Sequence, residues 1–351
     1  MIKVSIIGAT GYTGSELLRY LIPHQDVELI HLTSRSHAGT QVTSYYPFLT
    51  GSIDLKFTEL KPVTVFTDSD VVFICLPHGH SMELSALASS YDVKVIDLGA
   101  DFRLKNIDVY EETYKVEHAA PNLLKDFVYG LPEKYREEIK HAQYIANPGC
   151  FVTSALLGLL HAVVHALIDP QSIIIDSKTG VSGAGRSAST DKLLTDKLLT
   201  ELLGNFKAYN PLAHRHIPEI EQELNNSSEN TVQVQFTPHL IPTERGIFST
   251  IYASVQDGIT EGDIIESYKT AYQDEPFVHV LDKGELPQMK HVSGTNNCQL
   301  SVQFDERTGR LLVLSIIDNL GKGAAGQVVQ NMNIMFGLPE KTGLNTIAMM
   351  P

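Results

Sequence analysis

Residues 4–14 read Val4-Ser5-Ile6-Ile7-Gly8-Ala9-Thr10-Gly11-Tyr12-Thr13-Gly14, a short apolar run followed by a loop that contains three glycines. This order predicts a β-strand, a tight turn and the start of a helix, the setting in which main-chain N–H groups approach a pyrophosphate. The spacing is G-x-x-G-x-x-G rather than G-x-G-x-x-G, so the loop alone leaves open another nucleotide or a merely tight turn. The candidate cofactor-binding residues are Gly8, Thr10, Gly11, Tyr12, Thr13 and Gly14.

The sequence that follows this loop alternates between short β-favouring runs and helical patterns. The runs cover residues 28–33, 71–76 and 93–98, and helical patterns cover 15–21 and 81–90. Such alternation predicts a parallel βαβ sheet.

The strands predicted after Cys150 are longer and partly alternating, as is typical of a mixed or antiparallel sheet. They cover residues 172–176, 231–237, 246–255, 299–304 and 311–318. We therefore expect an α/β fold with an N-terminal Rossmann-like parallel sheet and an α+β catalytic domain with a mixed or antiparallel sheet. The first domain is expected to comprise residues 1–148, with a C-terminal helix within 321–351 packing back on it, and the second residues 149–320.

Composition limits the classes of partner. The chain has 351 residues, of which 41 are acidic and 27 basic, so its formal net charge is −14. A negative chain repels phosphate backbones, and we expect neither nucleic acid nor a membrane surface as a partner. The apolar stretch 155–168 is too short to span a bilayer and predicts a buried helix.

The three cysteines, Cys75, Cys150 and Cys298, lack the spacing of a disulfide framework or a zinc site, which favours a reducing compartment. The glycine loop follows the N-terminus too closely for a signal peptide, so a cytoplasmic location is expected. Cys75 lies inside a predicted strand and Cys298 precedes one, and both are interpreted as core residues. His161 and His165 would share a helix face, but no third ligand is recognisable, so no metal is expected.

The end of the second predicted strand bears on the type of cofactor. NAD enzymes usually place an acidic residue there, which accepts a hydrogen bond from the ribose 2′-hydroxyl. This chain has Thr33-Ser34-Arg35-Ser36 instead. A guanidinium flanked by two hydroxyls suits a 2′-phosphate and favours NADP(H), although a solvated loop arginine is the alternative.

Asn147-Pro148-Gly149-Cys150 joins the two predicted domains and precedes the apolar helix. Cys150 therefore lies near a helix N-terminus, where the dipole and main-chain N–H groups stabilise a thiolate. A thiolate attacks an acyl carbonyl, and the same N–H groups can hold the resulting oxyanion. A single cysteine at a helix start is more often structural, but the glycine loop upstream favours the nucleophile.

Thioester chemistry needs a proton donor and acceptor, and a histidine is the economical choice. The candidates are in His214-Arg215-His216-Ile217-Pro218-Glu219, where Pro218 suits the first turn of a helix. Glu219 would be close enough to orient an imidazole. Surface histidines before an ordinary helix are the alternative. Arg103, Arg186 and Arg245 lie beside glycine or turn signals and can bind phosphates or carboxylates.

Taken together, these motifs resemble those of the N-acetyl-gamma-glutamyl-phosphate reductase family of arginine biosynthesis over essentially the whole chain. The resemblance is carried by residues 8–14, 76–79, 97–103, 129–133, 147–150, 182–186, 214–219 and 318–327.

The resemblance implies that Cys150 is acylated and that His216 or His214 is the acid/base, with His216 preferred because Glu219 follows it by three residues. Similarity to the wider aspartate-semialdehyde dehydrogenase group implies Arg103 for the acyl phosphate and Arg245 for the substrate carboxylate. Further residues that the matching motifs place at the cofactor are Pro77, Asn319, Lys322 and Gly323, and at the substrate Asn147 and Arg186.

The expected reaction is NADPH-dependent reduction of N-acetyl-γ-glutamyl phosphate to N-acetylglutamate semialdehyde and phosphate, by a homo-oligomer that is a dimer or tetramer. Two alternatives remain open from the sequence. One is the same chemistry on aspartyl phosphate or a carrier-bound aminoadipyl phosphate. The other is a redox sensor that binds NADP without turnover.

Overall fold

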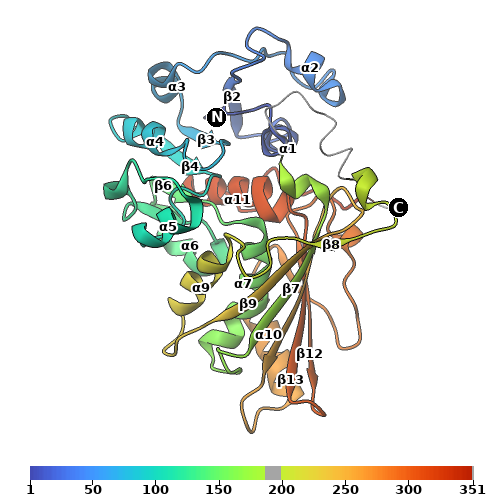
Figure 1. Cartoon of the computed structure of the whole chain (residues 1–351). Coiled ribbons are helices and arrows are strands. Elements are labelled where there is room, and N and C mark those ends of the chain that lie inside the picture. The colour runs from blue at the N-terminus through green and yellow to red at the C-terminus, as the bar shows by residue number, and fades with distance from the viewer. Residues whose placement is uncertain (186–198, 350–351) are drawn as a thin grey trace. The chain divides into compact units, whose positions relative to one another are not determined.

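The computed structural model describes residues 1–185 and 199–349. The chain divides into two compact units, each with its own sheet (Figure 1). Unit 1 comprises Met1–Pro148 and Ala324–Asn345, and unit 2 comprises Gly149–Gly323 with the residues from Thr346 onward.

Unit 1 is built on a six-stranded parallel sheet with the order β2-β1-β3-β4-β6-β5. Its strands are β1 (Ile2–Ile7), β2 (Val27–Thr33), β3 (Val71–Ile74), β4 (Lys94–Asp97), β5 (Phe127–Tyr129) and β6 (Tyr144–Ala146). Its helices are α1 (Tyr12–Leu21), α2 (Val42–Tyr45), α3 (Pro62–Asp68), α4 (Met82–Ala88), α5 (Ile107–Tyr114), α6 (Pro132–His141) and α11 (Gly326–Met335), with 3₁₀ turns η1 (Pro47–Leu49) and η2 (Pro121–Leu123).

The central strand β3 is buried, as is typical of a parallel sheet that is covered on both faces. All four residues of β3 are buried, and their continuous apolar run suits a strand covered on both faces. On one face a core cluster gathers residues such as Phe66, Phe102 and Phe127. The predicted Rossmann-like sheet is confirmed.

Unit 2 has a mixed seven-stranded sheet with the order β11-β12-β13-β10-β7-β9-β8, in which β11–β12 and β7–β9 are parallel pairs. Its strands are β7 (Ile173–Thr179), β8 (Lys207–Ala208), β9 (Val234–Leu240), β10 (Ile247–Ser254), β11 (Val278–Val280), β12 (Cys298–Asp305) and β13 (Arg310–Ile317). Its helices are α7 (Cys150–Val164), α9 (Ile217–Asn225) and α10 (Glu261–Tyr272), with 3₁₀ turns η3 (Val181–Ala184) and η4 (Met289–His291); a π-helix, η5 (Gly321–Ala325), follows β13.

The apolar helix α7 packs on one face of this sheet, against β10 and β13. Small residues allow the close approach: Ser154 Oγ donates to Ser249 Oγ at 2.9 Å, and a Cβ on Gly158 would lie 2.8 Å from Ile251 Cδ1. The hydroxyl of Tyr268 in α10 donates to the carbonyl of Gly158 at 2.7 Å. The predicted buried helix is therefore present and begins at Cys150.

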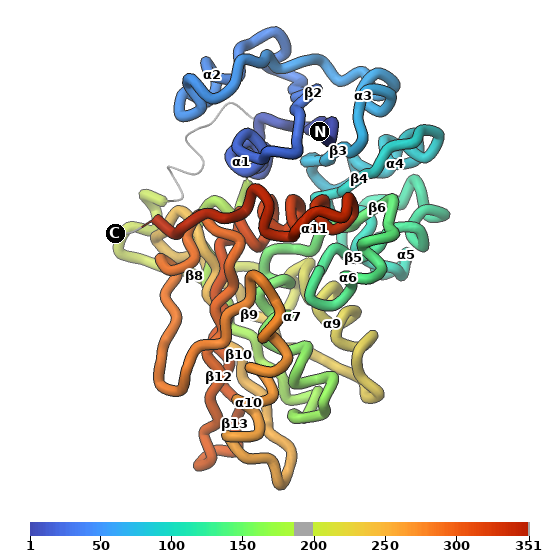
Figure 2. The backbone as a smooth tube through the Cα atoms, turned by 180° about the vertical axis from the view of Figure 1, so that it is seen from behind, coloured from blue at the N-terminus to red at the C-terminus, as the bar shows by residue number. Residues whose placement is uncertain are grey.

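A C-terminal helix lies within the expected range 321–351. α11 covers Gly326–Met335, and the chain then turns at Gly337, where φ is +67°. A glycine in the left-handed region commonly ends a helix. Figure 2 shows α11 in unit 1, where it contacts α1 and α6.

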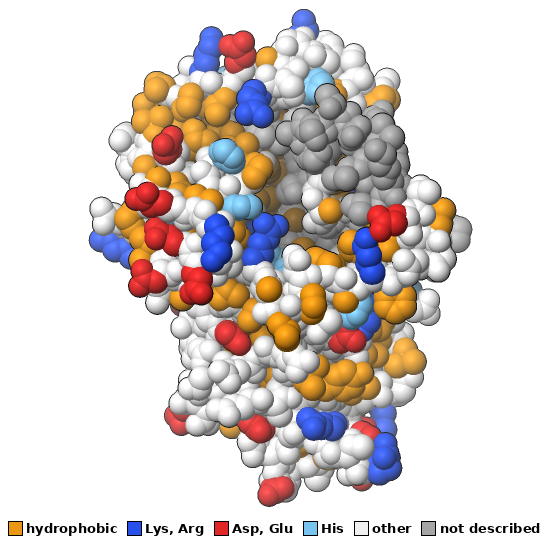
Figure 3. Space-filling model, in the orientation of Figure 1, with side chains coloured by type: hydrophobic (Ala, Val, Ile, Leu, Met, Phe, Trp, Pro, Cys, Tyr) orange, Lys and Arg blue, Asp and Glu red, His pale blue; other side chains and the backbone are white. Residues whose placement is uncertain are grey.

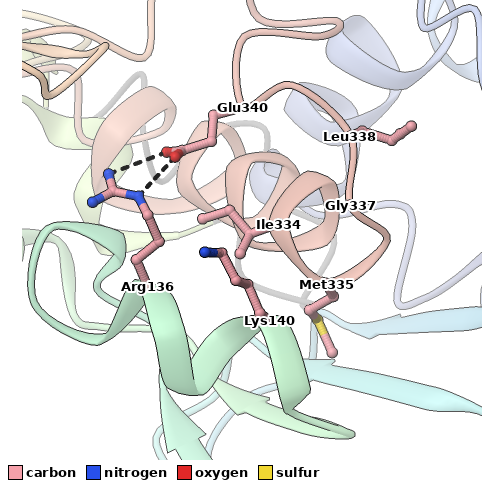
Figure 4. Close-up of a pocket in the computed structure, with 7 residues that line it drawn as sticks. All are labelled: Arg136, Lys140, Ile334, Met335, Gly337, Leu338 and Glu340. Carbon is pink, nitrogen blue, oxygen red and sulfur yellow. Dashed lines mark hydrogen bonds and ion pairs between the residues drawn. The ribbon is translucent and has the colours of Figure 1, made fainter.

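Residues after α11 are held on unit 1 by a few polar contacts. Arg136 donates from Nε to Glu340 Oε1 at 2.7 Å, and Gln330 donates to Glu340 Oε2 at 2.8 Å. Figure 4 shows this pair beside a cavity of about 370 Å³ between α6 and the end of α11. Asn333, also in α11, has its Oδ1 3.0 Å from Nε2 of His24. These contacts anchor the C-terminal segment.

Candidate active site

Cys150 is the first residue of α7, directly after the N-cap Gly149. Gly149 is in an extended conformation with φ −65° and ψ 146°, and the first turn carries uncharged residues. Main-chain N–H groups in the first turn of a helix lack intrahelical acceptors, so they favour negative charge at this end. The thiol of Cys150 is half-buried. The location is suited to a thiolate nucleophile.

The imidazole of His216 lies against the residue that precedes Cys150. A Cβ on Gly149 would lie 2.6 Å from His216 Nε2, so only glycine leaves room for the ring. The main-chain N–H of Gly149 donates to Glu219 Oε1 at 2.9 Å. His216 is buried, and Glu219, in the first turn of α9, is fully buried. The structure therefore places His216 and Glu219 against Gly149, the residue before Cys150, and orientation of an imidazole by Glu219 stays a prediction.

His214 contacts both the main chain and the ring of His216. Its Nδ1 accepts the main-chain N–H of His216 at 3.1 Å, and its ring centroid lies 4.7 Å from that of His216. Burial, aided by the neighbouring Arg215, lowers the pKa of His214 to about 4. The imidazole is thus neutral near pH 7, and its Nδ1 is already used as an acceptor. His216 is the better placed acid/base.

Sequence reasoning missed Tyr209. Its ring lies 5.6 Å from that of His214, and burial together with the charge of Cys150 raises the pKa of its hydroxyl. The phenol therefore stays protonated near Cys150. No motif marks a single tyrosine after β8, and only the fold brings it near Cys150.

The π-helix η5 packs against Cys150 through Gly323. A Cβ on Gly323 would lie 2.9 Å from Cys150 Cβ, and one on Gly321 would lie 2.0 Å from the carbonyl oxygen of Thr295. Short π-helical segments occur frequently at functional sites. The two glycines are therefore required by the close approach of the main chain.

Two residues expected at the cofactor, Lys322 and Asn319, are buried in this segment. Lys322 is 0 % exposed, with its ammonium 5.9 Å from the ring centroid of Phe277. Asn319 is 2 % exposed; its Oδ1 accepts from Gly246 N at 2.7 Å and its Nδ2 donates to Ser182 at 3.0 Å. Both side chains are thus enclosed by the protein, and their contact with a cofactor stays a prediction.

Arg245 forms a two-pronged ion pair with the buried Asp318. Nε lies 3.0 Å from Oδ2 and Nη2 lies 3.1 Å from Oδ1, and the arginine side chain is 22 % exposed. Asp318 also accepts the main-chain N–H of Gly294 at 2.6 Å. Arg245 is consequently held in one orientation, with part of the guanidinium at the surface. Arg186, the other candidate of this unit, lies outside the described residues.

In unit 1 the glycine loop follows β1 and leads into α1, as predicted. Gly8 has φ +85°, and a Cβ there would lie 2.6 Å from the carbonyl oxygen of Cys75. A Cβ on Gly14 would lie 2.5 Å from the carbonyl oxygen of Ala9. Gly11, the N-cap of α1, has open space around its Cβ position, where the nearest heavy atom is 3.9 Å away. The main chain is thus closely packed around Gly8 and Gly14 and leaves open space at Gly11, where α1 begins.

Two tyrosines that sequence reasoning missed hold this loop. Tyr46 donates to the carbonyl oxygens of Ala9 and Gly11, each at 3.2 Å, and Tyr45 donates to Thr10 at 3.4 Å. Their signal in the sequence is weak, because they follow a turn-rich stretch. Their hydroxyls hold the carbonyl oxygens of the loop on the side of the tyrosines.

The end of β2 lies beside the same loop. Ser34 is buried, and its hydroxyl is 3.3 Å from that of Thr10, whereas Arg35 and Ser36 are exposed. An exposed guanidinium at this position can reach a phosphate on the ribose. Pro77 follows β3 at the same carboxyl edge of the sheet and is also exposed.

Arg103 and Asn147 are buried in unit 1. Arg103 donates from Nε to the carbonyl of Asn147 at 2.7 Å and from Nη2 to that of Leu98 at 2.9 Å. Asn147 is 1 % exposed. Arg103 thus holds the main chain three residues before Cys150, a contact that its sequence pattern did not predict.

Among the described residues, no three His, Cys, Asp or Glu side chains are grouped as a metal site. His161 and His165 do lie together, with ring centroids 4.4 Å apart. Over the same part of the chain, no helix combines the length and apolar character needed to cross a membrane.

Comparisons with protein families agree with the two units. Residues 3–142 match the model described as semialdehyde dehydrogenase, NAD binding domain, and residues 150–319 match semialdehyde dehydrogenase, dimerisation domain.

Curated relatives match over the full length. The chain is 53 % identical to the N-acetyl-gamma-glutamyl-phosphate reductase of Pelotomaculum thermopropionicum, covering 98 % of this chain and 97 % of that protein. It is 49 % identical to that of Desulforamulus reducens, covering 100 % of both.

Solved structures share the fold at low identity. Aspartate semialdehyde dehydrogenase II of Vibrio cholerae, complexed with ASA, has a TM-score of 0.73 at 16 % identity, covering 96 % of this chain and 98 % of that one. The Candida albicans enzyme with NADP has a TM-score of 0.70 at 15 % identity, covering 96 % and 98 %.

Proposed function

This chain belongs to the N-acetyl-gamma-glutamyl-phosphate reductase family, and we propose that it reduces N-acetyl-γ-glutamyl phosphate to N-acetylglutamate semialdehyde through a thioester on Cys150. The observation that carries the proposal is the packing of the His216 ring against Gly149, beside the thiol at the start of α7.

In the first half of the reaction the Cys150 thiolate attacks the γ-acyl carbon. The new C–S bond forms as the C–O bond to phosphate breaks, and inorganic phosphate leaves with that electron pair. N–H groups in the first turn of α7 would stabilise the oxyanion that develops. Tyr209 is a second donor near the sulfur.

In the second half, NADPH supplies the hydride that reduces the thioester carbon. The resulting oxyanion then collapses, the C–S bond breaks, and the sulfur leaves as a thiolate. His216 would exchange a proton with the oxyanion, while neutral His214 accepts the main-chain N–H of His216 and holds that residue in place. Glu219 would fix the main chain at Gly149.

The residues present in unit 1 fit NADP(H) rather than NAD(H). Gly8, Gly11 and Gly14 would allow the pyrophosphate to approach α1, and the exposed Arg35 and Ser36 would bind the 2′-phosphate. Further contacts proposed from the sequence are Thr10, Tyr12, Thr13, Ser34, Pro77, Asn319, Lys322 and Gly323.

For the substrate we propose Arg103, Asn147, Arg186 and Arg245, with Arg245 offering the exposed part of its guanidinium to the α-carboxylate. On this assignment, residues 1–148 with the C-terminal helix form the NADP-binding domain, and residues 149–320 form the catalytic domain. A reducing compartment such as the cytoplasm would keep Cys150 as a thiol.

We further propose a homodimer that forms through the face of the second sheet opposite α7 and α10. Side chains on that face are exposed or half-buried and partly apolar, such as Ile174 (38 % exposed) and Tyr252 (39 % exposed), which are paired neighbours on β7 and β10. Figure 3 shows apolar side chains gathered over this part of unit 2. Tyr252→Asp should shift the protein to a monomer in sedimentation, whereas Leu286→Asp, at another exposed apolar position, should not.

The test of function is the reverse reaction, which avoids the unstable acyl phosphate. Purified protein is mixed with N-acetylglutamate semialdehyde, phosphate and NADP, and NADPH absorbance is followed. Phosphate-dependent NADPH formation, lost in Cys150→Ser, supports the proposal. Turnover of aspartate semialdehyde instead would reassign the substrate, and NADP binding without any turnover would indicate a sensor.

A further inference from the structure

A single hydroxyl in unit 1 bridges two buried carboxylates. Ser81 Oγ lies 2.9 Å from Asp97 Oδ2 and 2.8 Å from Asp101 Oδ2. All three residues are 0 % exposed. Asp97 is the last residue of β4, and Ser81 is the N-cap of α4, so the bridge ties the sheet edge to the start of that helix.

The number of protons at this bridge determines its charge. A serine hydroxyl carries one hydrogen and can donate to one oxygen at a time. Both distances are those of true O–H···O bonds, so each needs a hydrogen. With both carboxylates ionised, one short oxygen–oxygen contact would have none. One carboxyl must therefore be protonated and donate to Ser81 Oγ.

Asp101 is the ionised partner. Its Oδ1 accepts from Gly79 N at 2.7 Å and from the hydroxyl of Tyr110 at 2.8 Å. Its Oδ2 accepts from Ser81 N at 3.0 Å as well as from the Ser81 hydroxyl. Four donors directed at one carboxylate stabilise its charged form.

Asp97 is the protonated partner. Its Oδ1 accepts from Gly99 N at 2.9 Å, which leaves Oδ2 to carry the proton toward Ser81. Burial and the charge of Asp101 raise the pKa of Asp97 to about 7, an effect that Arg103 reduces only in part. The proton is therefore present below about pH 7 and lost above it.

Four other titratable groups lie around Asp97 and Asp101. The Cys75 thiol and the Tyr110 hydroxyl both have raised pKa values, in each case mainly through burial, and stay neutral. His118 packs its ring 5.0 Å from Tyr110, and its Nε2 lies 2.7 Å from the carbonyl of Asp101. Arg103 is a cation near Asp97 that offsets part of the rise in its pKa, and it also donates to two main-chain carbonyls.

The bridge sets the shape of the loop 77–81, which adjoins the glycine loop. Asp101 receives the N–H groups of both Gly79 and Ser81, so it fixes the loop at two points. The chain that leads into this loop, at Cys75, is 2.6 Å from the Cβ position of Gly8. A change in the bridge is thus transmitted to the carboxyl edge where the cofactor would bind.

We propose that Asp97 is a positioning residue whose carboxyl must be protonated for the loop 77–81 to hold NADP(H) tightly, so that cofactor affinity falls as the pH rises. The inference rests on the proposed cofactor site in unit 1. It assigns to Asp97 no contact with the cofactor.

The test compares NADPH binding by the full chain at pH 6 and pH 9, measured by nicotinamide fluorescence, in wild type and Asp97→Asn. An asparagine amide can donate to Ser81 Oγ and accept from Gly99 N, so it imitates the protonated acid at every pH. We expect the wild-type dissociation constant to rise about tenfold, a common size for such coupling. Asp97→Asn should show no such step between the two pH values.

Asp70→Asn is the matched control, because Asp70 is an exposed acid of the same unit that accepts a main-chain N–H from Lys3. It should keep the wild-type pH step. The cofactor phosphate also titrates near pH 6, but it does so equally in all three proteins. A wild-type profile without a step, or the same step in Asp97→Asn, would overturn the inference, whereas absence of NADPH binding at any pH would overturn the proposed cofactor site.

Should Asp97→Asn fail to fold, infrared difference spectra of the wild type between pH 6 and pH 9 give a second measurement. A buried protonated carboxyl that disappears with rising pH supports the inference, and its environment should change in Ser81→Ala. A spectrum without such a band at pH 6 contradicts it.

Discussion

Helices α1 and α7 both have a glycine as the N-cap, but their N-termini are surrounded differently. Gly11 precedes α1 and Gly149 precedes α7, and in both helices the first turn is uncharged. The Cβ position of Gly11 is open, whereas that of Gly149 lies 2.6 Å from His216. One N-terminus is open, and the other carries a thiol and is enclosed by His216. On the proposed function, the same local motif serves binding in one unit and reactivity in the other.

The largest effect is expected at the enclosed terminus. His216→Asn removes the proposed acid/base and should lower kcat by about 10³-fold with little change in KM, because proton transfer contributes roughly 10²- to 10⁴-fold. His214→Asn keeps an acceptor for the N–H of His216 and should cost less than about tenfold. Steady-state kinetics of both variants check this, and an equal loss in the two would contradict the assignment of His216.

The pH dependence of unfolding offers the next test, because His214 is buried as a neutral ring. Its pKa falls from 6.5 in the unfolded chain to about 4 in the folded one. Between these values the unfolded state binds more protons, so stability is lost as the pH falls from about 6.5 to 4. At 1.36 kcal/mol per pH unit the loss is at most about 3 kcal/mol. Denaturant titrations should show a flatter profile in His214→Gln; an unchanged profile would contradict the burial of a neutral ring.

A matched pair of glycine substitutions separates the two helix N-termini. Both glycines have negative φ angles that alanine adopts freely, so strain does not enter. Gly149→Ala should displace the His216 ring and lower kcat by about 10²-fold, as misplaced catalytic groups do. Gly11→Ala should instead weaken NADPH binding and leave the reactivity of Cys150 toward an alkylating agent unchanged. The comparison fails if both variants lose the same property.

The smallest effect concerns cofactor choice at the open terminus. Arg35→Ala should raise the KM for NADPH by about tenfold, since a hydrogen bond to a charged group contributes roughly 1.5–3 kcal/mol, part of which solvent replaces. The KM for NADH should not change. If the KM values for NADPH and NADH rise together, Arg35 does not bind the 2′-phosphate.

Much of unit 1 could be predicted because its signals are local. The glycine loop, the alternation of strands and helices, and the β2 end at Ser34 and Arg35 all follow from neighbouring residues. Strands β5 and β6 were not predicted, since three residues each are too few to show a pattern. The bridge at Ser81 was missed because its partners are 16 and 20 residues away.

The site in unit 2 could be predicted in its residue types and not in its geometry. Cys150 and His216 stand out through glycine and proline neighbours, but the contact between Gly149 and His216 spans 67 positions and depends on how α9 packs on α7. Tyr209 has no motif at all. Lys322 and Asn319 matched a motif and are buried, so their contact with the cofactor stays a prediction.

The central claim is that Cys150 forms a thioester before hydride transfer. The most direct measurement is rapid mixing of the protein with N-acetyl-γ-glutamyl phosphate without cofactor, followed by phosphate assay and mass analysis of the peptide that contains Cys150. We predict a burst of one phosphate per chain and a mass increase on Cys150 equal to the acyl group, both abolished in Cys150→Ser. Phosphate release that requires NADPH, with no adduct on Cys150, would contradict the account.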